Sequence, residues 1–337
     1  MRSRLSFALL ALPYLVTSTA AVTPEAAQNE LAARVEKLTA AEAAGVRGAD
    51  GWYFATAELR AYSAGKFWGD AAATASRAPK DKDPLPTIVA FNDMLKQVGV
   101  PLIVVPVPGK VVLYPDKLDP PLHVDSRLDG THVAFFDELR KAGVTVIDVE
   151  PDFRTLRTSG VDPFCKQDPH WSPRGLEAAA KRMADLVKGQ AWYVGVAKHK
   201  ATTTEQPVEV RGDIVAALLR DGGQPPERLT LQQVKLDGDW VDSDAASPVV
   251  LMGDSHTLVF HRPDLLGEHA GLSDQLAALL GFPVDLVGVM GGGANASRVA
   301  LARRRDNLAG KKVVLWVFRA SEFSETDEGW RPIPVIR

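Results

Sequence analysis

The chain has 337 residues, of which 46% are hydrophobic, and a formal net charge of −3 with a sequence pI near 6.2. A chain of this length and composition can bury a substantial core, which excludes a fibrous or disordered protein. The small negative charge provides no long-range attraction to polyanions, so we predict no nucleic-acid partner.

The chain begins with the layout of an export signal. Arg2 and Arg4 precede an apolar run from Leu5 to Val16, and small residues continue through Ala21. The run is short and contains a proline, which disfavours a membrane span. We predict that residues 1–21 are a signal peptide, either cleaved or retained as an anchor, and that the protein is exported.

The remaining chain alternates between helical and strand patterns. Residues 22–44 are rich in Ala and Glu and predict a lead-in helix, and residues 77–86 predict an exposed loop. Apolar β-branched runs lie at 100–107, 144–149, 248–252, 284–290 and 312–318, with helical stretches at 87–97, 132–142, 173–187, 271–280 and 295–308. This alternation predicts an α/β fold, a mostly parallel central sheet with helices on both faces.

The domain organisation follows from the same pattern. We predict a single domain over residues 45–337, with a polar insertion or lid around residues 198–246. The single cysteine, Cys165, excludes an intrachain disulfide. Cys165 is either an inert packing thiol or a nucleophile, and the lack of a surrounding basic cluster favours the first interpretation.

A serine follows one of the predicted strands. Ligands of open parallel sheets bind beyond the carboxyl ends of the strands, where the segment "VVLMGDSHT" presents Ser255. Gly253 permits a sharp turn there, as at the nucleophile elbow of serine hydrolases, although the GxSxG signature is absent. A plain turn is the alternative interpretation of Gly-Asp-Ser.

The segment "QDPHWSPRG" supplies the groups that a serine nucleophile needs. Asp168 and His170 flank a proline that favours extended backbone at Asp168, so both side chains are expected on one side of the chain. The carboxylate would then hold the imidazole Nδ1 proton and leave Nε2 free to accept a proton from Ser255. Ser172 and Pro173 are expected to begin the following helix as N-cap and first residue.

Further candidates follow other strands. The Ser255 amide, Gly292, Gly293 and the side chain of Asn295 are candidate oxyanion donors, with a capped loop as the alternative. Lys110, Tyr114 and Arg319 are candidate ligands for an anionic sugar. His256, next to the serine, is expected to have a structural or substrate-contact role.

Five segments in this order resemble the SGNH-hydrolase-like family of the alginate O-acetyltransferases AlgJ and AlgX. They are "GADGWYF", "VVPVPGKVVLYPDKL", "QDPHWSPRG", "RGDIVAALL" and "LMGDSHT", and the resemblance extends over about residues 48–323. In that family an Asp-x-His pair and a later serine form the catalytic triad, which implies that Asp168, His170 and Ser255 are catalytic here. Ordinary SGNH esterases have the serine first, so the order in this chain is permuted.

The resemblance also implies a reaction and a location. It implies a periplasmic enzyme that passes acetyl groups, delivered by a membrane-bound O-acyltransferase, through an acetyl-serine to hydroxyls of an exopolysaccharide. Association with the inner membrane or a polysaccharide-export complex would fit this role, and no cofactor or metal is expected. Transfer to water instead would make the protein an acetylesterase.

Two alternatives belong to other classes. Asp168, His170, Asp254 and His256 resemble the ligands of a dinuclear metallophosphoesterase, but "DPH" follows no apolar strand and no Gly-Asn-His occurs downstream. A non-catalytic carbohydrate-binding protein is the other alternative, and it predicts that Ser255 is dispensable.

Overall fold

The computed structural model describes residues 22–337 apart from residues 42, 125 and 220–222. The predicted signal peptide, residues 1–21, lies outside the described residues. In the described part of the chain, no helix has both the length and the apolar character needed to cross a bilayer.

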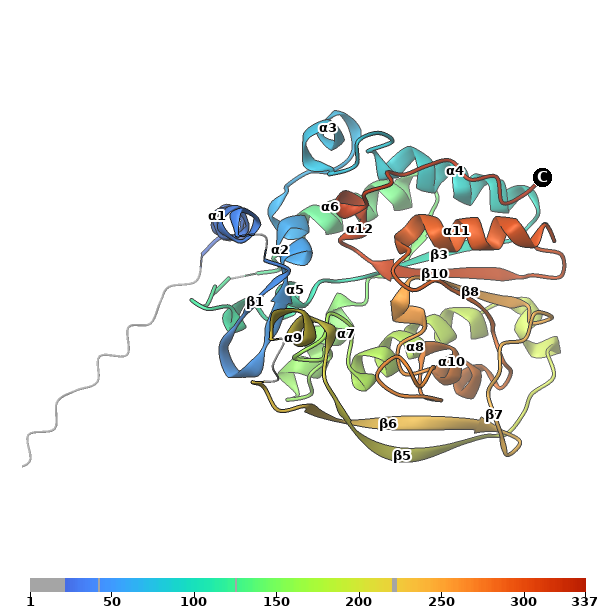
Figure 1. Cartoon of the computed structure of the whole chain (residues 1–337). Helices are drawn as coiled ribbons and strands as arrows, with labels where there is room; N and C mark the ends of the chain where they lie inside the picture. The colour runs from blue at the N-terminus through green and yellow to red at the C-terminus, as the bar shows by residue number, and fades with distance from the viewer. Residues whose placement is uncertain (1–21, 42, 125, 220–222) are drawn as a thin grey trace, which may run out of the picture.

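The centre of the molecule is a five-stranded parallel sheet (Figure 1). Its strands are β3 (Leu102–Val107), β4 (Thr145–Val146), β8 (Val249–Gly253), β9 (Asp285–Gly288) and β10 (Val313–Arg319), in the spatial order β4-β3-β10-β8-β9. Every pair in this sheet is parallel. Each predicted strand therefore exists, and the predicted fold class is confirmed.

The sheet separates two hydrophobic cores because the side chains of its strands alternate between the faces. On β10, Val313, Leu315 and Val317 face one core, whereas Val314, Trp316 and Phe318 face the other. All six side chains are buried. Burial on both faces explains why these strands read as continuous apolar runs.

Helices cover both faces (Figure 1). One core includes side chains from α4 (Pro84–Gln97), α6 (Gly130–Lys141) and α11 (Gly293–Arg304). The other includes side chains from α7 (Glu150–Thr158), α8 (Pro173–Lys188) and α10 (Leu272–Leu280). The predicted lead-in helix is α1 (Pro24–Ala40), which packs against α2 (Thr56–Ser63) through Ala27, Leu31 and Val35.

The polar stretch around residues 198–246 forms a small antiparallel sheet. Strands β5 (Ala201–Val210) and β6 (Glu227–Leu236) pair over ten residues each, and β7 (Asp239–Trp240) adds to the end of β6. The ribbon packs against α8 and α10, as Figure 1 shows at the foot of the molecule. Between β5 and β6 lies α9 (Asp213–Leu218), which packs near the hairpin of β1 (Gly45–Arg47) and β2 (Tyr53–Ala55).

Helix boundaries differ from the predicted ones where capping decides them. Helix α4 starts at Pro84 rather than Thr87 because the Asp83 carboxylate accepts the Leu85 amide at 2.9 Å. Helix α11 ends at Arg304 rather than Leu308 because Arg305 adopts a left-handed conformation (φ 57°). The remaining helices are short: α3 (Ala72–Ala75), α5 (Lys110–Leu113) and α12 (Glu322–Glu325).

Candidate active site

Ser255 lies just past the carboxyl end of β8, in a 3-10 turn over Ser255–Thr257. Asp254 caps this turn by accepting the His256 amide at 2.9 Å. Gly253 is needed for close packing rather than for the predicted sharp turn, since a Cβ atom there would lie 1.8 Å from the carbonyl oxygen of Val317. Strand β10 therefore packs directly against the backbone that precedes Ser255.

Ser255, His170 and Asp168 form a continuous hydrogen-bonded chain. The Ser255 Oγ lies 2.7 Å from His170 Nε2, and His170 Nδ1 lies 2.6 Å from Asp168 Oδ1. A carboxylate only accepts, so Nδ1 donates and Nε2 is left to accept the serine proton. The structure therefore joins residues 85 positions apart in the arrangement that the sequence predicts.

The loop that holds Asp168 and His170 precedes α8. Ser172 caps that helix by accepting the Gly175 amide at 3.2 Å, and Pro173 is its first residue, as predicted. The His170 amide also donates to Asp168 Oδ1 at 3.0 Å. The relative position of Asp168 and His170 is therefore held by hydrogen bonds that do not involve Ser255.

The insertion supplies the outer support of Asp168, which sequence reasoning missed. The amide of Asp213, at the start of α9, donates to Asp168 Oδ2 at 2.8 Å. The preceding Gly212 allows this approach, because a Cβ atom there would lie 2.3 Å from the carbonyl of Gln167. In the sequence, the segment "RGD" contributed only to the family resemblance and did not indicate a contact with Asp168.

The charges of the triad reinforce one another. Burial alone would raise the pKa of Asp168, but the charge of His170 and three N–H donors outweigh it and hold the pKa well below its usual range. Burial likewise opposes protonation of His170, yet Asp168 raises the His170 pKa above its ordinary value of 6.5. The Asp168 carboxylate therefore stays ionised next to the His170 ring.

A second Asp-x-His pair brackets the serine. Asp254 Oδ1 accepts both the His256 amide and the His256 Nδ1 proton, at 2.9 and 3.0 Å, and Asp254 Oδ2 accepts the amide of Arg319 at 2.9 Å. Here burial dominates and lowers the pKa of His256, although Asp254 opposes it. The His256 ring packs beside His170, with ring centroids 4.6 Å apart.

The candidate oxyanion donors divide into two groups. The Ser255 amide has no hydrogen-bond acceptor among the described residues, which leaves it available to an oxyanion. Gly292 and Gly293 follow Val289, whose amide donates to Gly253 at 3.0 Å, so their loop starts beside the serine. A Cβ atom on Gly293 would lie 2.0 Å from the Glu322 carboxylate, which stands at the start of α11.

The prediction for Asn295 is wrong as an oxyanion donor. Its side chain is buried, its amide nitrogen donates to the carbonyl of Gly329, and its oxygen accepts from Arg298. The amide nitrogen therefore links α11 to the C-terminal segment, and the oxygen bonds within α11, so both ends of the side chain are already occupied.

Two of the three candidate sugar ligands are also corrected. Lys110 is fully buried, and its ammonium donates to the carbonyls of Tyr53 and Lys166 at 2.9 and 3.2 Å. Tyr114 is buried against Trp52, with ring centroids 3.8 Å apart, and its hydroxyl donates to Asp162. The position of Lys110 and Tyr114 after a predicted strand did not indicate that both side chains are buried.

Arg319 remains at the site. Its amide holds Asp254, while its guanidinium is half exposed and donates to Glu322 at 2.6 and 2.8 Å. It lines a small cavity with His256 and Pro169, the residue between the triad aspartate and histidine. Glu58 of α2 lines the same cavity, and burial raises its pKa to about 7. Nothing in the sequence around Glu58 indicated this position.

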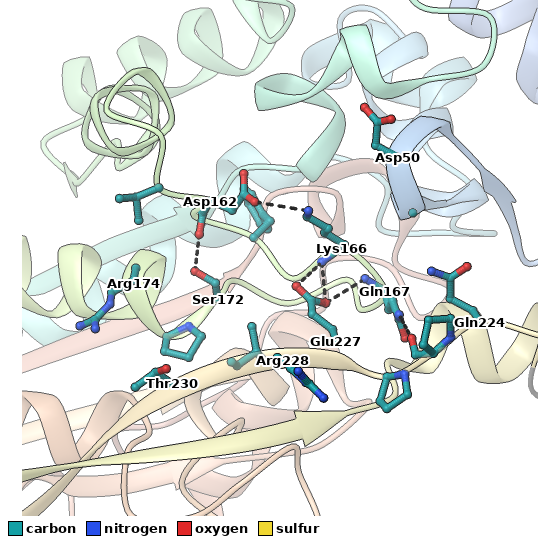
Figure 2. Close-up of a pocket in the computed structure, with 17 residues that line it drawn as sticks. Asp50, Asp162, Lys166, Gln167, Ser172, Arg174, Gln224, Glu227, Arg228 and Thr230 are labelled. Atoms are coloured by element: carbon teal, nitrogen blue, oxygen red, sulfur yellow. Dashed lines mark hydrogen bonds and ion pairs between the residues drawn. The ribbon is translucent and has the colours of Figure 1, made fainter.

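A larger groove of about 610 Å³ lies where the loop leading to Asp168 meets the start of β6 (Figure 2). Figure 2 shows Glu227 beneath this loop, where its carboxylate accepts the amides of Lys166 at 2.8 and 3.0 Å and Gln167 at 3.3 Å. Asp168, His170 and Ser255 are not among the lining residues. The insertion thus supports the triad loop from two sides, through Glu227 and through α9.

Two alternatives from the sequence receive no support from this geometry. Cys165 is buried, and burial raises the pKa of its thiol well above the ordinary value, as expected of a packing residue. Within the described residues, no three His, Cys, Asp or Glu side chains converge as metal ligands would. The four residues of the metallophosphoesterase hypothesis form two separate Asp–His pairs instead.

The chain is thus an α/β protein in which Ser255, His170 and Asp168 have the hydrogen-bonded order found in serine hydrolases. Residues 46–320 match the model of the family described as SGNH hydrolase-like domain, acetyltransferase AlgX. The chain therefore belongs to the SGNH hydrolase-like AlgX acetyltransferase family.

Individual relatives are similar over part of their length. A probable alginate O-acetylase AlgJ of Pseudomonas fluorescens is 29% identical over 184 residues, covering 50% of this chain and 45% of the relative. The alginate biosynthesis protein AlgX of Pseudomonas putida is 24% identical over 260 residues, covering 72% and 52%. The chain thus spans about half the length of the curated relatives it matches.

A solved structure has the same fold. The O-acetyltransferase domain of Pseudomonas putida AlgJ superposes with a TM-score of 0.62 at 21% identity, covering 84% of this chain and 93% of that one. The Pseudomonas aeruginosa AlgX structure gives the same TM-score at 18% identity, covering 86% and 66%.

Proposed function

We propose that this chain is a serine-dependent polysaccharide O-acetyltransferase that works through an acetyl-serine intermediate. The observation that carries the proposal is the 2.7 Å contact between Ser255 Oγ and a His170 ring that Asp168 holds on its other side. The chain belongs to a family named for an acetyltransferase, which supports acetyl as the transferred group. Relatives named probable alginate O-acetylases support a polysaccharide as the acceptor.

The residues have separate tasks in the cycle. His170 takes the Ser255 proton as the serine oxygen attacks the acetyl carbon of the donor, and then returns it to the departing donor alcohol. In the second half, His170 takes the proton of a sugar hydroxyl that attacks the acetyl group, and passes it to Ser255 as the ester breaks. Asp168 stabilises the imidazolium in both halves.

The oxyanion of each tetrahedral intermediate requires fixed donors, each typically contributing about 3 to 4 kcal/mol. We assign the Ser255 amide as the first donor because it has no acceptor among the described residues. Gly292 and Gly293 remain candidates for the second. No step in this cycle uses a cofactor.

The cellular setting is part of the proposal. The export-signal layout of residues 1–21 and the polymer-modifying relatives favour a periplasmic enzyme. Its acetyl donor would be supplied by a membrane-bound O-acyltransferase, and its acceptor would be a bacterial exopolysaccharide. Association with the inner membrane or a polysaccharide-export complex would bring donor and acceptor together.

The test is transfer from a chromogenic acetyl ester to a mannuronate oligosaccharide and, in a parallel reaction, to a cello-oligosaccharide. We expect mass spectrometry to detect O-acetylated sugar with the wild-type protein and none above background with Ser255→Ala. Release of acetate without sugar product from either acceptor would identify an acetylesterase. Equal product from Ser255→Ala would contradict a serine mechanism.

A further inference from the structure

His256 has one ring nitrogen without a hydrogen-bond partner among the described residues. Its Nδ1 donates to Asp254 at 3.0 Å, and its Nε2 has no hydrogen-bond partner among the described residues. Because Asp254 holds the proton on Nδ1, the neutral ring presents a lone pair at Nε2. His256 Nε2 is therefore available to accept a hydrogen bond from a bound molecule.

The cavity beside His256 limits what that group can be. Its volume is about 40 Å³, room for roughly two or three water-sized groups. Small apolar residues form much of its wall, and the polar groups on it come from Glu58, Arg319 and Ser321 as well as His256. A hydroxyl-bearing carbon fits this space, whereas a whole sugar ring does not.

The cavity lies beside the loop that carries His170, although neither His170 nor Ser255 lines it. The His256 and His170 rings lie 4.6 Å apart between centroids, and His170 holds Ser255. Pro169, between Asp168 and His170, forms part of the cavity wall. A group bound to His256 therefore lies beside a group bound to His170.

A hydroxyl suits this position better than the acetyl group does. The carbonyl oxygen of an acetyl ester has no proton to donate and would face the lone pair of Nε2. A hydroxyl donates its proton to Nε2 and can still accept from a neighbouring donor. Arg319, whose guanidinium donates to Glu322, lines the same cavity.

We propose that His256 binds an acceptor hydroxyl adjacent to the hydroxyl that is acetylated, so that the enzyme selects acceptors with neighbouring hydroxyl groups. This inference rests on the proposed function and assigns to it a determinant of acceptor specificity. The attacking oxygen forms its bond to the acetyl carbon while its proton passes to His170. The bond from the acetyl carbon to Ser255 Oγ then breaks, and Oγ takes that proton from His170. His256 exchanges no proton and only holds the neighbouring hydroxyl.

The test offers acetyl-Ser255 two small alcohols at once. The protein is acetylated with a chromogenic acetyl ester in an equimolar mixture of glycerol, which has adjacent hydroxyls, and 1-propanol, which has one. Mass spectrometry gives the ratio of glycerol acetate to propyl acetate. This ratio is independent of how fast acetyl-Ser255 forms.

We expect the wild-type protein to favour glycerol, and His256→Leu to lose about three- to tenfold of that preference, as for one hydrogen bond. His256→Gln, which keeps an acceptor atom, should restore part of it. His261→Leu is the control, because it also removes a ring that bonds a buried aspartate, Asp274, at a distinct site. The control should retain the wild-type ratio.

The possible failures are distinct. A mass spectrum without acetyl-Ser255 overturns the proposed function and this inference with it. Acetyl-Ser255 that yields only acetate, or a wild-type ratio equal to that of His256→Leu, overturns the inference alone. Equal losses in His256→Leu and His261→Leu, with both proteins folded by circular dichroism, would assign His256 a merely structural role.

Discussion

The two Asp-x-His pairs around Ser255 share one local geometry and differ in what faces the histidine. In both pairs, Oδ1 of the aspartate accepts the amide and the Nδ1 proton of the histidine two residues later. In both, Oδ2 accepts a backbone amide from another element. Only His170 has the serine opposite its Nε2.

The surroundings also move the two pKa values in opposite directions. Both rings are buried, which favours the neutral form, but Asp254 and Asp213 add to the effect of Asp168 and raise the pKa of His170. For His256, the charges of His170 and Arg319 act with burial and lower its pKa. The aspartate partner orients each histidine ring. Burial and the other nearby charges decide whether the pKa of that ring is raised or lowered, and so whether the ring can serve as a base.

Replacing each histidine with glutamine tests this comparison most strongly. We expect His170→Gln to slow hydrolysis of a chromogenic acetyl ester by on the order of 10³- to 10⁴-fold, because no base remains for Ser255. His256→Gln should cost less than about tenfold, since it touches only the acceptor side. Steady-state kinetics measure both, with His261→Gln as a control. Comparable losses of hydrolysis rate in His170→Gln and His256→Gln would contradict the assignment of His170 alone as the base.

Removing the charge of each aspartate should give the next largest difference. We expect Asp168→Asn to lower kcat by on the order of 10³-fold, because a neutral amide no longer stabilises the imidazolium. Asp254→Asn should have a much smaller effect, because its ring partner takes no proton. A loss with Asp254→Asn that matched Asp168→Asn would mean that both pairs act in proton transfer.

The support from the insertion can be removed with a single methyl group. Gly212→Ala places a Cβ atom against the backbone of Gln167, so α9 should move away from Asp168. We expect about a tenfold loss of activity and a decrease of about 1–3 kcal/mol in the free energy of unfolding. Denaturant titration and ester hydrolysis measure the two effects.

Gly223→Ala is the matched control for this change, because a Cβ atom at Gly223 has no atom of the described residues within 4 Å. If Gly212→Ala behaved like this control, the amide of Asp213 would have no part in holding the triad.

The smallest expected effect is on the pH dependence. Protonated His170 cannot accept the serine proton, so kcat/KM should rise with pH through the raised pKa, above 6.5. Because Asp254 also raises that pKa, Asp254→Asn should move the rise to lower pH. A pH–rate profile measures both. A rise of the wild-type kcat/KM centred below pH 6.5 would contradict a His170 pKa that the neighbouring carboxylates raise.

Much of the fold could be predicted because the central strands are buried on both faces. Apolar runs such as 312–318 are long and continuous, and their spacing from helices is regular. Strand β4 pairs over only two residues, shorter than its apolar run. The ribbon of β5 and β6 was not predicted because β5 is largely exposed, so its sequence, "ATTTEQPVEV", carries no apolar face.

The candidate site was predictable to the extent that its residues lie close together in sequence. Asp168 and His170 share one loop, and Ser255 follows an obvious strand. Lys110 and Tyr114 were predicted to bind sugar and Asn295 to bind the oxyanion, because strand ends are usually open. Here their partners come from distant segments that cover them. Glu58 and the amide of Asp213 belong to the site through tertiary contacts, which no local pattern encodes.

Whether Ser255 carries the acetyl group can be measured on the protein itself. The protein is mixed with a chromogenic acetyl ester, quenched in acid, digested and sequenced by mass spectrometry. We expect a single acetyl adduct on Ser255 that accumulates in the wild-type protein and is absent from Ser255→Ala. An adduct on another side chain in the wild-type protein, retained in Ser255→Ala with full turnover, would contradict this expectation.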